Sequence, residues 1–212
     1  MIAGQDPVGN GFVQSLARPG GNVTGLDSIA GQGLRAKRLS MLKEIDPTLS
    51  RVAVLREVGA SSERLSTELR EAAHALGLVL EIVAFRNADG LEDALATIAE
   101  QRGRALVIDG GPLVQANMNR IAAFAIQHRM LATYSGRQYA ADGLLFTYGL
   151  AIPDNYRRAA FFVDRILKGA RPSELPVEQP LRFELILNQK TAKAIGVSFP
   201  RSFVARADEI IE

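Results

Sequence analysis

The sequence contains no cysteine and no tryptophan, and only 2 of its 212 residues are histidine. Without cysteine the chain cannot form a disulfide, use a thiolate as a nucleophile or bind a metal ion through sulfur. His74 and His128 lie in separate helical patterns with no second histidine beside them, so no zinc site is predicted. We therefore expect neither a metal nor any other cofactor.

Long apolar runs are also missing. No stretch approaches the roughly 20 apolar residues that a membrane-spanning helix requires. Residues 1–6 have neither the basic start nor the apolar segment of a signal peptide, which predicts a cytoplasmic location if Met1 is the native start.

The excess of one sign of charge is also small, because the formal net charge is only +2. The one local basic cluster is Arg35, Lys37 and Arg38. Its helical spacing is typical of a solvated helix face, and this interpretation is favoured over a nucleic-acid site. With 47% hydrophobic and 23% charged residues, the composition is that of an ordinary soluble globular chain.

The positive signal is a repeated unit. Short apolar runs, each typical of a buried parallel strand, begin at residues 51, 78, 104 and 130. Their starts lie about 26 to 27 residues apart, which is roughly one strand and one helix. We therefore predict an α/β fold with a Rossmann-like parallel sheet and helices on both faces. Such a sheet binds ligands at the carboxyl ends of its strands.

Further elements follow from local patterns. We predict strands at 144–148 and 181–187, a capping box of Asp89 with Glu92, and a last helical turn at 207–211. A helix opened by Pro153 has an apolar set that is predicted to face inward, namely Tyr156, Ala159, Ala160, Val163 and Leu167.

Two candidate binding positions follow the first and third strands. Ser61 and Ser62 offer hydroxyl and N–H groups to a carboxylate where the strand enters its helix, or they only cap that helix. Asp109 ends the third strand beside Gly110, where the backbone permits close approach. Its carboxylate could hold an amino group, or it could cap the next helix.

Another candidate set follows the fourth strand. Tyr134, Ser135 and Arg137 combine an aromatic face, a hydroxyl and a guanidinium, and we predict a wall and an anion contact there over a plain surface loop. Asp6 is a weaker candidate, because its Asp-Pro-Val-Gly context is typical of a turn.

Several long segments, in the same order, resemble the family of ABC-transporter substrate-binding proteins whose best-known members take up tryptophan or tyrosine. The segments are Asp6-Pro-Val-Gly, Leu16-Ala-Arg-Pro-Gly-Gly-Asn-Val-Thr-Gly, Arg51-Val-Ala-Val-Leu, Gly143-Leu-Leu-Phe-Thr-Tyr-Gly, Pro153-Asp-Asn-Tyr-Arg-Arg-Ala, Ile166-Leu-Lys-Gly-Ala-Arg-Pro, Leu175-Pro-Val-Glu-Gln-Pro, Phe183-Glu-Leu-Ile-Leu-Asn and Lys190-Thr-Ala-Lys-Ala-Ile-Gly. The resemblance covers nearly the whole chain.

This resemblance implies a type I periplasmic-binding-protein fold. Two Rossmann-like lobes capture a small solute in the cleft between them by hinge closure. It implies no catalysis, a periplasmic location and delivery of the solute to an ABC permease. Two departures concern the site: Glu57-Val58 stand where the family usually has Asn-Pro, and Gly111 stands where it often has Asp.

The resemblance also suggests a division of the chain. Residues 1–22 correspond to a remnant of the N-terminal lobe, 23–147 to the C-terminal lobe, 148–179 to a return into the remnant, and 180–212 to a crossover strand, a short helix and a C-terminal arm. Most of the N-terminal lobe has no counterpart here. The apolar faces of a partial lobe would be exposed, which predicts homo-oligomers.

Two alternatives stay open. The chain could be a truncated cytosolic ligand sensor or an interaction module. It could also be a Rossmann-like enzyme, although it has no G-x-G-x-x-G after a strand, no P-loop, no G-x-S-x-G and no histidine–carboxylate arrangement. The leading hypothesis is non-catalytic binding of a small, amino-acid-like or aromatic solute.

Overall fold

A computed structural model describes residue 1 and residues 7–27, 33–59, 63–179 and 182–212, with side chains in helix α2 from Thr67 onward. The chain divides into two compact units. The first comprises residues 1–32 and 150–183, and the second comprises residues 33–149 and 184–212. The assignment of these units to the lobes of the predicted fold stays a prediction.

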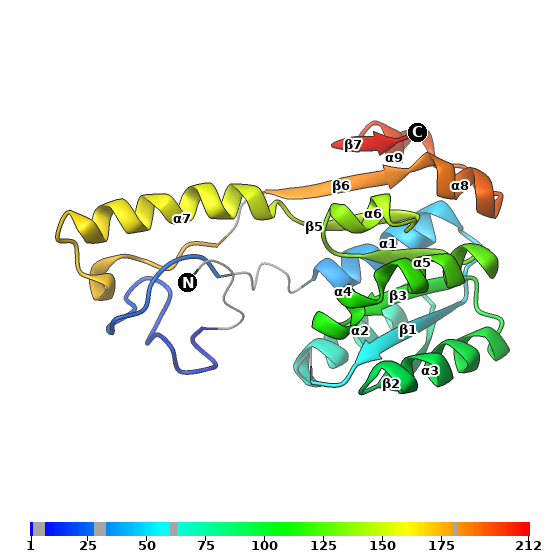
Figure 1. Cartoon of the computed structure of the whole chain (residues 1–212), viewed down its shortest axis with the longest axis horizontal. Helices are drawn as coiled ribbons and strands as arrows, with labels where there is room; N and C mark the ends of the chain where they lie inside the picture. The colour runs from blue at the N-terminus through cyan, green and yellow to red at the C-terminus, as the bar shows by residue number, and fades with distance from the viewer. Residues whose placement is uncertain (2–6, 28–32, 60–62, 180–181) are drawn as a thin grey trace. The chain divides into compact units, whose positions relative to one another are not determined.

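The second unit alternates strands and helices along most of its length (Figure 1). Its elements are α1 (Leu34–Ile45), β1 (Arg51–Glu57), α2 (Glu63–Ala75), β2 (Val79–Phe85), α3 (Ala88–Glu100), β3 (Ala105–Asp109), α4 (Pro112–Ala116), α5 (Met118–Gln127), β4 (Leu131–Tyr134), α6 (Gln138–Ala141), β5 (Phe146–Leu150), β6 (Phe183–Asn188), α8 (Gln189–Ile195), α9 (Arg201–Val204) and β7 (Glu209–Ile211).

One seven-stranded sheet organises these elements, with the strand order β2-β1-β3-β4-β5-β6-β7. Strand β1 pairs in parallel with both β2 and β3, and parallel pairing continues through β4 to β5. Strands β6 and β7 are also parallel to each other. The predicted α/β class and the Rossmann-like parallel sheet are therefore confirmed.

The core lies on both faces of this sheet because successive strand residues point to opposite sides. Val52 and Val54 of β1 belong to a cluster that includes Leu39 of α1. Ala53 and Leu55 of the same strand belong to another cluster, which contains side chains of α3 and α5. Helices therefore cover both faces of the sheet in the second unit, as Figure 1 shows.

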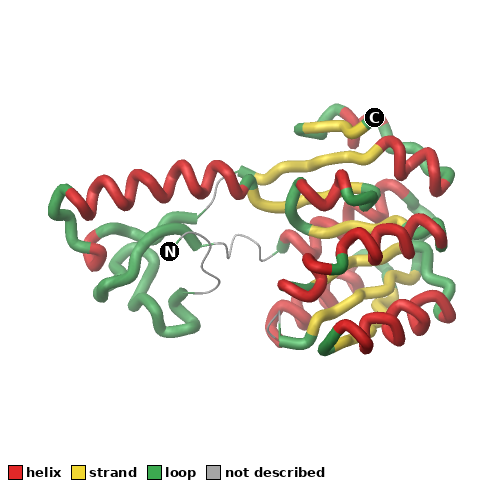
Figure 2. The backbone as a smooth tube through the Cα atoms, viewed as in Figure 1, coloured by secondary structure: helices red, strands yellow, loops and turns green. Residues whose placement is uncertain are grey.

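The first unit consists mainly of loops around one long helix, α7 (Ile152–Leu167), with a short 3-10 helix η2 (Pro172–Glu174) (Figure 2). Its buried apolar cluster is small, with Leu26, Phe162 and Leu175 at its centre. A parallel bridge joins Leu26 to Glu178. Backbone hydrogen bonds on either side of this bridge link residues 25–27 to residue 178.

Several local predictions were wrong in detail. The strand expected at 144–148 is β5, Phe146–Leu150, because its pairing with β4 sets its start. The last helical turn expected at 207–211 is strand β7, since pairing with β6 outweighs a weak local pattern. Helix α3 is capped by the side chain of Asn87, which accepts a hydrogen bond from the Gly90 N–H, in place of the predicted Asp89 box.

The orientation predicted for α7 was wrong except at Ala159, which is buried as predicted. Its buried residues are Asn155, Ala159 and Phe162, whereas Tyr156 and Val163 are exposed. Periodicity located an apolar face on this helix but not the part of it that neighbouring residues cover. Among the described residues, no helix is both long and apolar enough to cross a membrane.

Candidate functional site at the strand ends

Three parallel strands end together in the second unit. Strands β1, β3 and β4 finish at Glu57, Asp109 and Tyr134. Their registers place Arg56 opposite Asp109 and Val107 opposite Thr133, so the carboxyl ends of β1, β3 and β4 are aligned. These ends therefore lie along one edge of the sheet, where an open α/β sheet binds ligands.

Asp109 is paired at this edge with Arg35, from the first turn of α1. Both Nε and Nη2 of Arg35 donate to Oδ1 of Asp109, at 2.8 and 2.6 Å. The Arg35 side chain is 22% exposed and that of Asp109 only 6%. The predicted carboxylate is thus in place, and in this structure a cation of the chain itself holds it.

A second basic side chain of α1 is buried beside this pair. Nη1 of Arg38 donates to the carbonyl of Tyr148 at 3.1 Å, while its buried Nε has no hydrogen-bond partner among the described residues. Burial, and after it the cation of Arg35, lowers the pKa of Arg38 to about 10, against the opposing effect of the Asp109 carboxylate. The predicted solvated basic face was therefore wrong for Arg38, which is 4% exposed.

Glu57 caps the N-terminus of the short helix α4. Its Oε2 accepts hydrogen bonds from the N–H groups of Gly111 and Val114, at 2.8 and 3.0 Å. The first N–H groups of a helix have no partner within the helix, so a carboxylate there satisfies them. The position where the family usually has Asn-Pro thus carries a capping carboxylate.

This capping role predicts the effect of removing Glu57. Glu57→Ala is expected to lower the free energy of unfolding by about 2 to 3 kcal/mol, because two backbone donors lose a charged acceptor. Glu57→Gln keeps an acceptor oxygen and should cost about 1 kcal/mol. Urea denaturation followed by circular dichroism measures both. Glu92, whose side chain is 52% exposed, is the control, and an equal loss in Glu92→Ala would contradict the assigned cap.

Gly110 lies between these groups and has no room for a side chain. A Cβ atom there would stand 2.2 Å from Cγ2 of Val114 and 3.1 Å from Cβ of Glu57. The carbonyl of Gly110 accepts a 2.7 Å hydrogen bond from the Tyr134 hydroxyl. The glycine is thus required by close packing at the strand ends.

The ring of Tyr134 is buried, with 5% of the residue exposed. It packs against Tyr139 with ring centroids 5.3 Å apart. Burial is the largest cause that raises the pKa of the Tyr134 hydroxyl. This aromatic side chain stands at the predicted strand end, and its contact with a solute stays a prediction.

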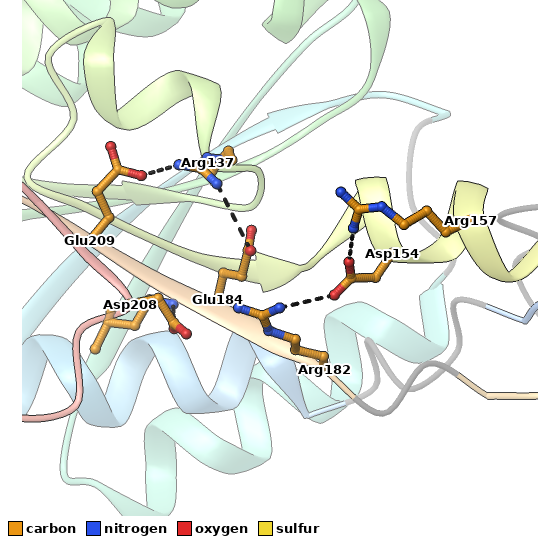
Figure 3. Close-up of polar contacts among 8 residues, drawn as sticks. Arg137, Asp154, Arg157, Arg182, Glu184, Asp208 and Glu209 are labelled. Carbon is orange, nitrogen blue, oxygen red and sulfur yellow. Dashed lines mark hydrogen bonds and ion pairs between the residues drawn. The ribbon is translucent and has the colours of Figure 1, made fainter.

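The predicted polar residues after β4 are also located. Ser135 is half-buried and lies close to β5, since a Cβ on Gly149 would stand 3.1 Å from the Ser135 Cβ. Arg137 forms an ion pair with Glu209 and lies 4.0 Å from a carboxylate oxygen of Glu184 (Figure 3). Two carboxylates of the chain therefore already compensate the charge of Arg137.

Three other candidates, Asp6, Ser61 and Ser62, lie outside the described residues. The structure brings Asp109, Gly110 and Tyr134 together, and adds Arg35, Arg38 and Glu57, which sequence reasoning did not select. The available signals were the departure from the family at Glu57 and the basic cluster that contains Arg35 and Arg38. Within the described residues, no group of three histidine, aspartate or glutamate side chains could hold a metal ion.

A family model described as ABC transporter substrate binding protein matches residues 1–211. A curated tyrosine-binding protein of Clostridioides difficile is 21% identical over 198 residues, covering 93% of this chain and 56% of the relative. The chain thus spans about half the length of that curated relative.

Solved structures show the same fold. A conserved domain protein of Vibrio cholerae has a TM-score of 0.84 and 25% identity, covering 97% of this chain and 68% of that one. The ABC domain from Streptococcus pneumonia in complex with L-Trp has a TM-score of 0.86 and 20% identity, covering all of this chain and 70% of that one. Because the family model covers almost every residue, the chain belongs to the family of ABC transporter substrate-binding proteins, which are binding proteins and not enzymes.

Proposed function

We propose that this chain binds a small amino-acid-like or aromatic solute, without catalysis, for delivery to the permease of an ABC importer. Membership of the substrate-binding family supports this function. So do the names of two relatives, a tyrosine-binding protein and a domain in complex with L-Trp. We also propose the extracytoplasmic location that such a role requires.

The observation that carries the proposal is the Arg35–Asp109 pair at the end of β3. An amino acid carries one carboxylate and one ammonium group, and a guanidinium beside a carboxylate complements both. Arg38 adds a second cation, whose Nε has no partner in the described part of the chain, and this favours an anionic group nearby. A solute that separates the pair would give its carboxylate to Arg35 and its ammonium to Asp109.

Isothermal titration calorimetry tests this assignment with three compounds. L-Tyrosine carries both charges, tyramine lacks the carboxylate, and 3-(4-hydroxyphenyl)propionate lacks the ammonium. We expect saturable binding of L-tyrosine, with each analogue about 10- to 100-fold weaker, because each loses one charged hydrogen-bonding group. L-Tryptophan is measured alongside, and saturating solute should raise the thermal unfolding midpoint by mass action.

Variants then assign each charge to a residue. Asp109→Asn should weaken the binding of L-tyrosine about 10- to 100-fold without weakening that of the propionate, and Arg35→Gln should weaken the binding of both without weakening that of tyramine. The exposed variant Glu92→Gln is the control, and circular dichroism verifies folding. Wild-type affinity for L-tyrosine in a folded Asp109→Asn would refute the role of Asp109. Absence of binding by every compound would refute the proposed function.

Self-association is a second part of the proposal. The first unit has a small buried cluster, and its long helix α7 exposes several large apolar side chains. An exposed apolar surface of this kind marks an interaction site. This feature also supports the alternative of an interaction module, for which the chain would form a stable oligomer without binding any of the three solutes.

A further inference from the structure

The peptide group that joins Gly110 to Gly111 is held from both sides. Its carbonyl oxygen accepts a 2.7 Å hydrogen bond from the hydroxyl of Tyr134, at the end of β4. Its N–H donates at 2.8 Å to Oε2 of Glu57, at the end of β1. Strand β3 lies between β1 and β4 in the sheet. The two neighbours of β3 therefore clamp one peptide group just beyond Asp109, and we call Glu57 and Tyr134 the clamp.

The turn after β3 has little rigidity of its own. Gly110 and Gly111 are consecutive, and glycine has more backbone freedom than any other residue. Two glycines in a row would leave the end of the strand free to sample several conformations. Hydrogen bonds to both polar atoms of the peptide group between them select one conformation. The clamp thus supplies the order that the glycines do not.

Asp109 depends on this turn because it directly precedes it. Its side chain is 6% exposed and accepts two hydrogen bonds from Arg35. A carboxylate that exchanges Arg35 for the ammonium of a solute is best supported by contacts that stay in place during the exchange. The clamp provides such contacts, because both of its hydrogen bonds to the turn are made with backbone atoms.

The burial of Tyr134 fits a role through the backbone. Only 5% of the residue is exposed, and its ring packs against Tyr139. Its hydroxyl also interacts with the side chain of Gln115, in α4. A ring covered in this way has little surface to offer to a solute. A hydroxyl bonded to the turn, in contrast, acts on the solute through the position of Asp109.

We propose that Glu57 and Tyr134 are positioning residues, which hold the Gly110–Gly111 peptide group and so keep the Asp109 carboxylate in the orientation that receives the solute ammonium. This role rests on the proposed ammonium contact of Asp109, whereas the order of the turn can be measured without a solute. The predicted aromatic wall is a different role for Tyr134, because it requires contact between the ring and the solute.

Tyr134→Phe separates the two roles, since it removes the hydroxyl and keeps the ring. We expect calorimetry to show L-tyrosine and tyramine bound about 3- to 10-fold more weakly, the effect of one lost hydrogen bond. The binding of 3-(4-hydroxyphenyl)propionate should not weaken, because this compound has no ammonium. Tyr139→Phe removes the hydroxyl of the neighbouring ring, and as the control it should bind all three compounds like the wild type.

Amide hydrogen exchange of the chain without solute gives a second readout, measured by NMR. The N–H of Gly111 is bonded to Glu57, so its exchange rate reports how often the clamp opens. Tyr134→Phe should raise this rate about tenfold and leave the rate at Val107, within β3, unchanged. Glu57→Gln should also raise the rate at Gly111, because a neutral oxygen is a weaker acceptor than a carboxylate.

The outcomes separate the clamp from the proposed function. If the wild type binds L-tyrosine and a folded Tyr134→Phe binds it equally well, or loses affinity equally for all three compounds, the positioning role is refuted. Unchanged exchange at Gly111 in Tyr134→Phe would refute the clamp, whatever the solutes do. If exchange rises but the wild type binds none of the compounds, the clamp is only structural, and its role in binding is refuted together with the proposed function. Circular dichroism verifies the fold of each variant.

Discussion

Replacing Phe203 by alanine is expected to lower the free energy of unfolding by about 3 to 5 kcal/mol, the usual cost of removing a buried aromatic side chain. Phe203 lies in the four-residue helix α9 and is fully buried. Its ring stands edge-on to Phe146 of β5 at 5.8 Å and stacks with Phe199 at 6.0 Å. This ring therefore helps to hold the C-terminal segment to the sheet, together with the pairing of β7 with β6.

The cost should be large because the neighbours cannot fill the space. Phe146 is itself fully buried in the sheet, so little collapse can follow the loss of the ring. Urea denaturation followed by circular dichroism measures the change. Val204→Ala, next in sequence and 42% exposed, should stay within about 0.5 kcal/mol of the wild type. Equal losses in the two variants would contradict an anchoring role for Phe203.

The central strands could be predicted from sequence because buried parallel strands are continuous apolar runs. The run at 51–56 became β1, with Val52, Ala53 and Leu55 fully or almost fully buried. Strand β7 could not be predicted in this way. It has three residues, and its strand conformation comes from pairing with β6. Local pattern therefore specifies the interior of this sheet better than its edge.

Helix α7 shows a different limit of prediction from sequence. Of the apolar set that was predicted to face inward, residues 156, 160, 163 and 167 are exposed and only Ala159 is buried, while Phe162, outside that set, is buried too. Periodicity shows where the apolar residues lie around a helix, but the neighbours decide which of them are covered. The small cluster of the first unit covers only the side of α7 that carries Phe162.

Only part of the candidate site could be predicted from the sequence. Asp109, Gly110 and Tyr134 were selected because strand ends follow from the strand pattern, and the parallel registers bring those ends to one edge. The partners of these residues could not be selected. Arg35 lies 74 positions from Asp109, and Glu57 lies 54 positions from Gly111. No spacing rule relates such distant residues, so only the fold reveals the pairs.

Gly110→Ala is expected to lower the free energy of unfolding by about 3 kcal/mol through overpacking. The added Cβ would stand 2.2 Å from Cγ2 and 2.8 Å from Cβ of Val114. Val114 is fully buried and branched at Cβ, so it cannot rotate out of the way. The shift would also disturb Glu57, whose Cβ is 3.1 Å from the new atom. Gly103→Ala is the matched control, because its Cβ would meet no heavy atom closer than 3.9 Å.

A double-mutant cycle separates this clash from other effects of the substitution. Val114→Ala alone should cost about 2 kcal/mol by opening a cavity. It also removes the Cγ2 atom that the new Cβ would strike, so the double variant should cost about 1 to 2 kcal/mol less than the sum of the two single changes. Additive losses would mean that the clash with Val114 is not the cause. If Gly110→Ala were as stable as Gly103→Ala, the close packing at the strand ends would itself be refuted. Because Tyr134 bonds to the Gly110 carbonyl, Gly110→Ala should also weaken L-tyrosine binding if the strand ends hold the solute.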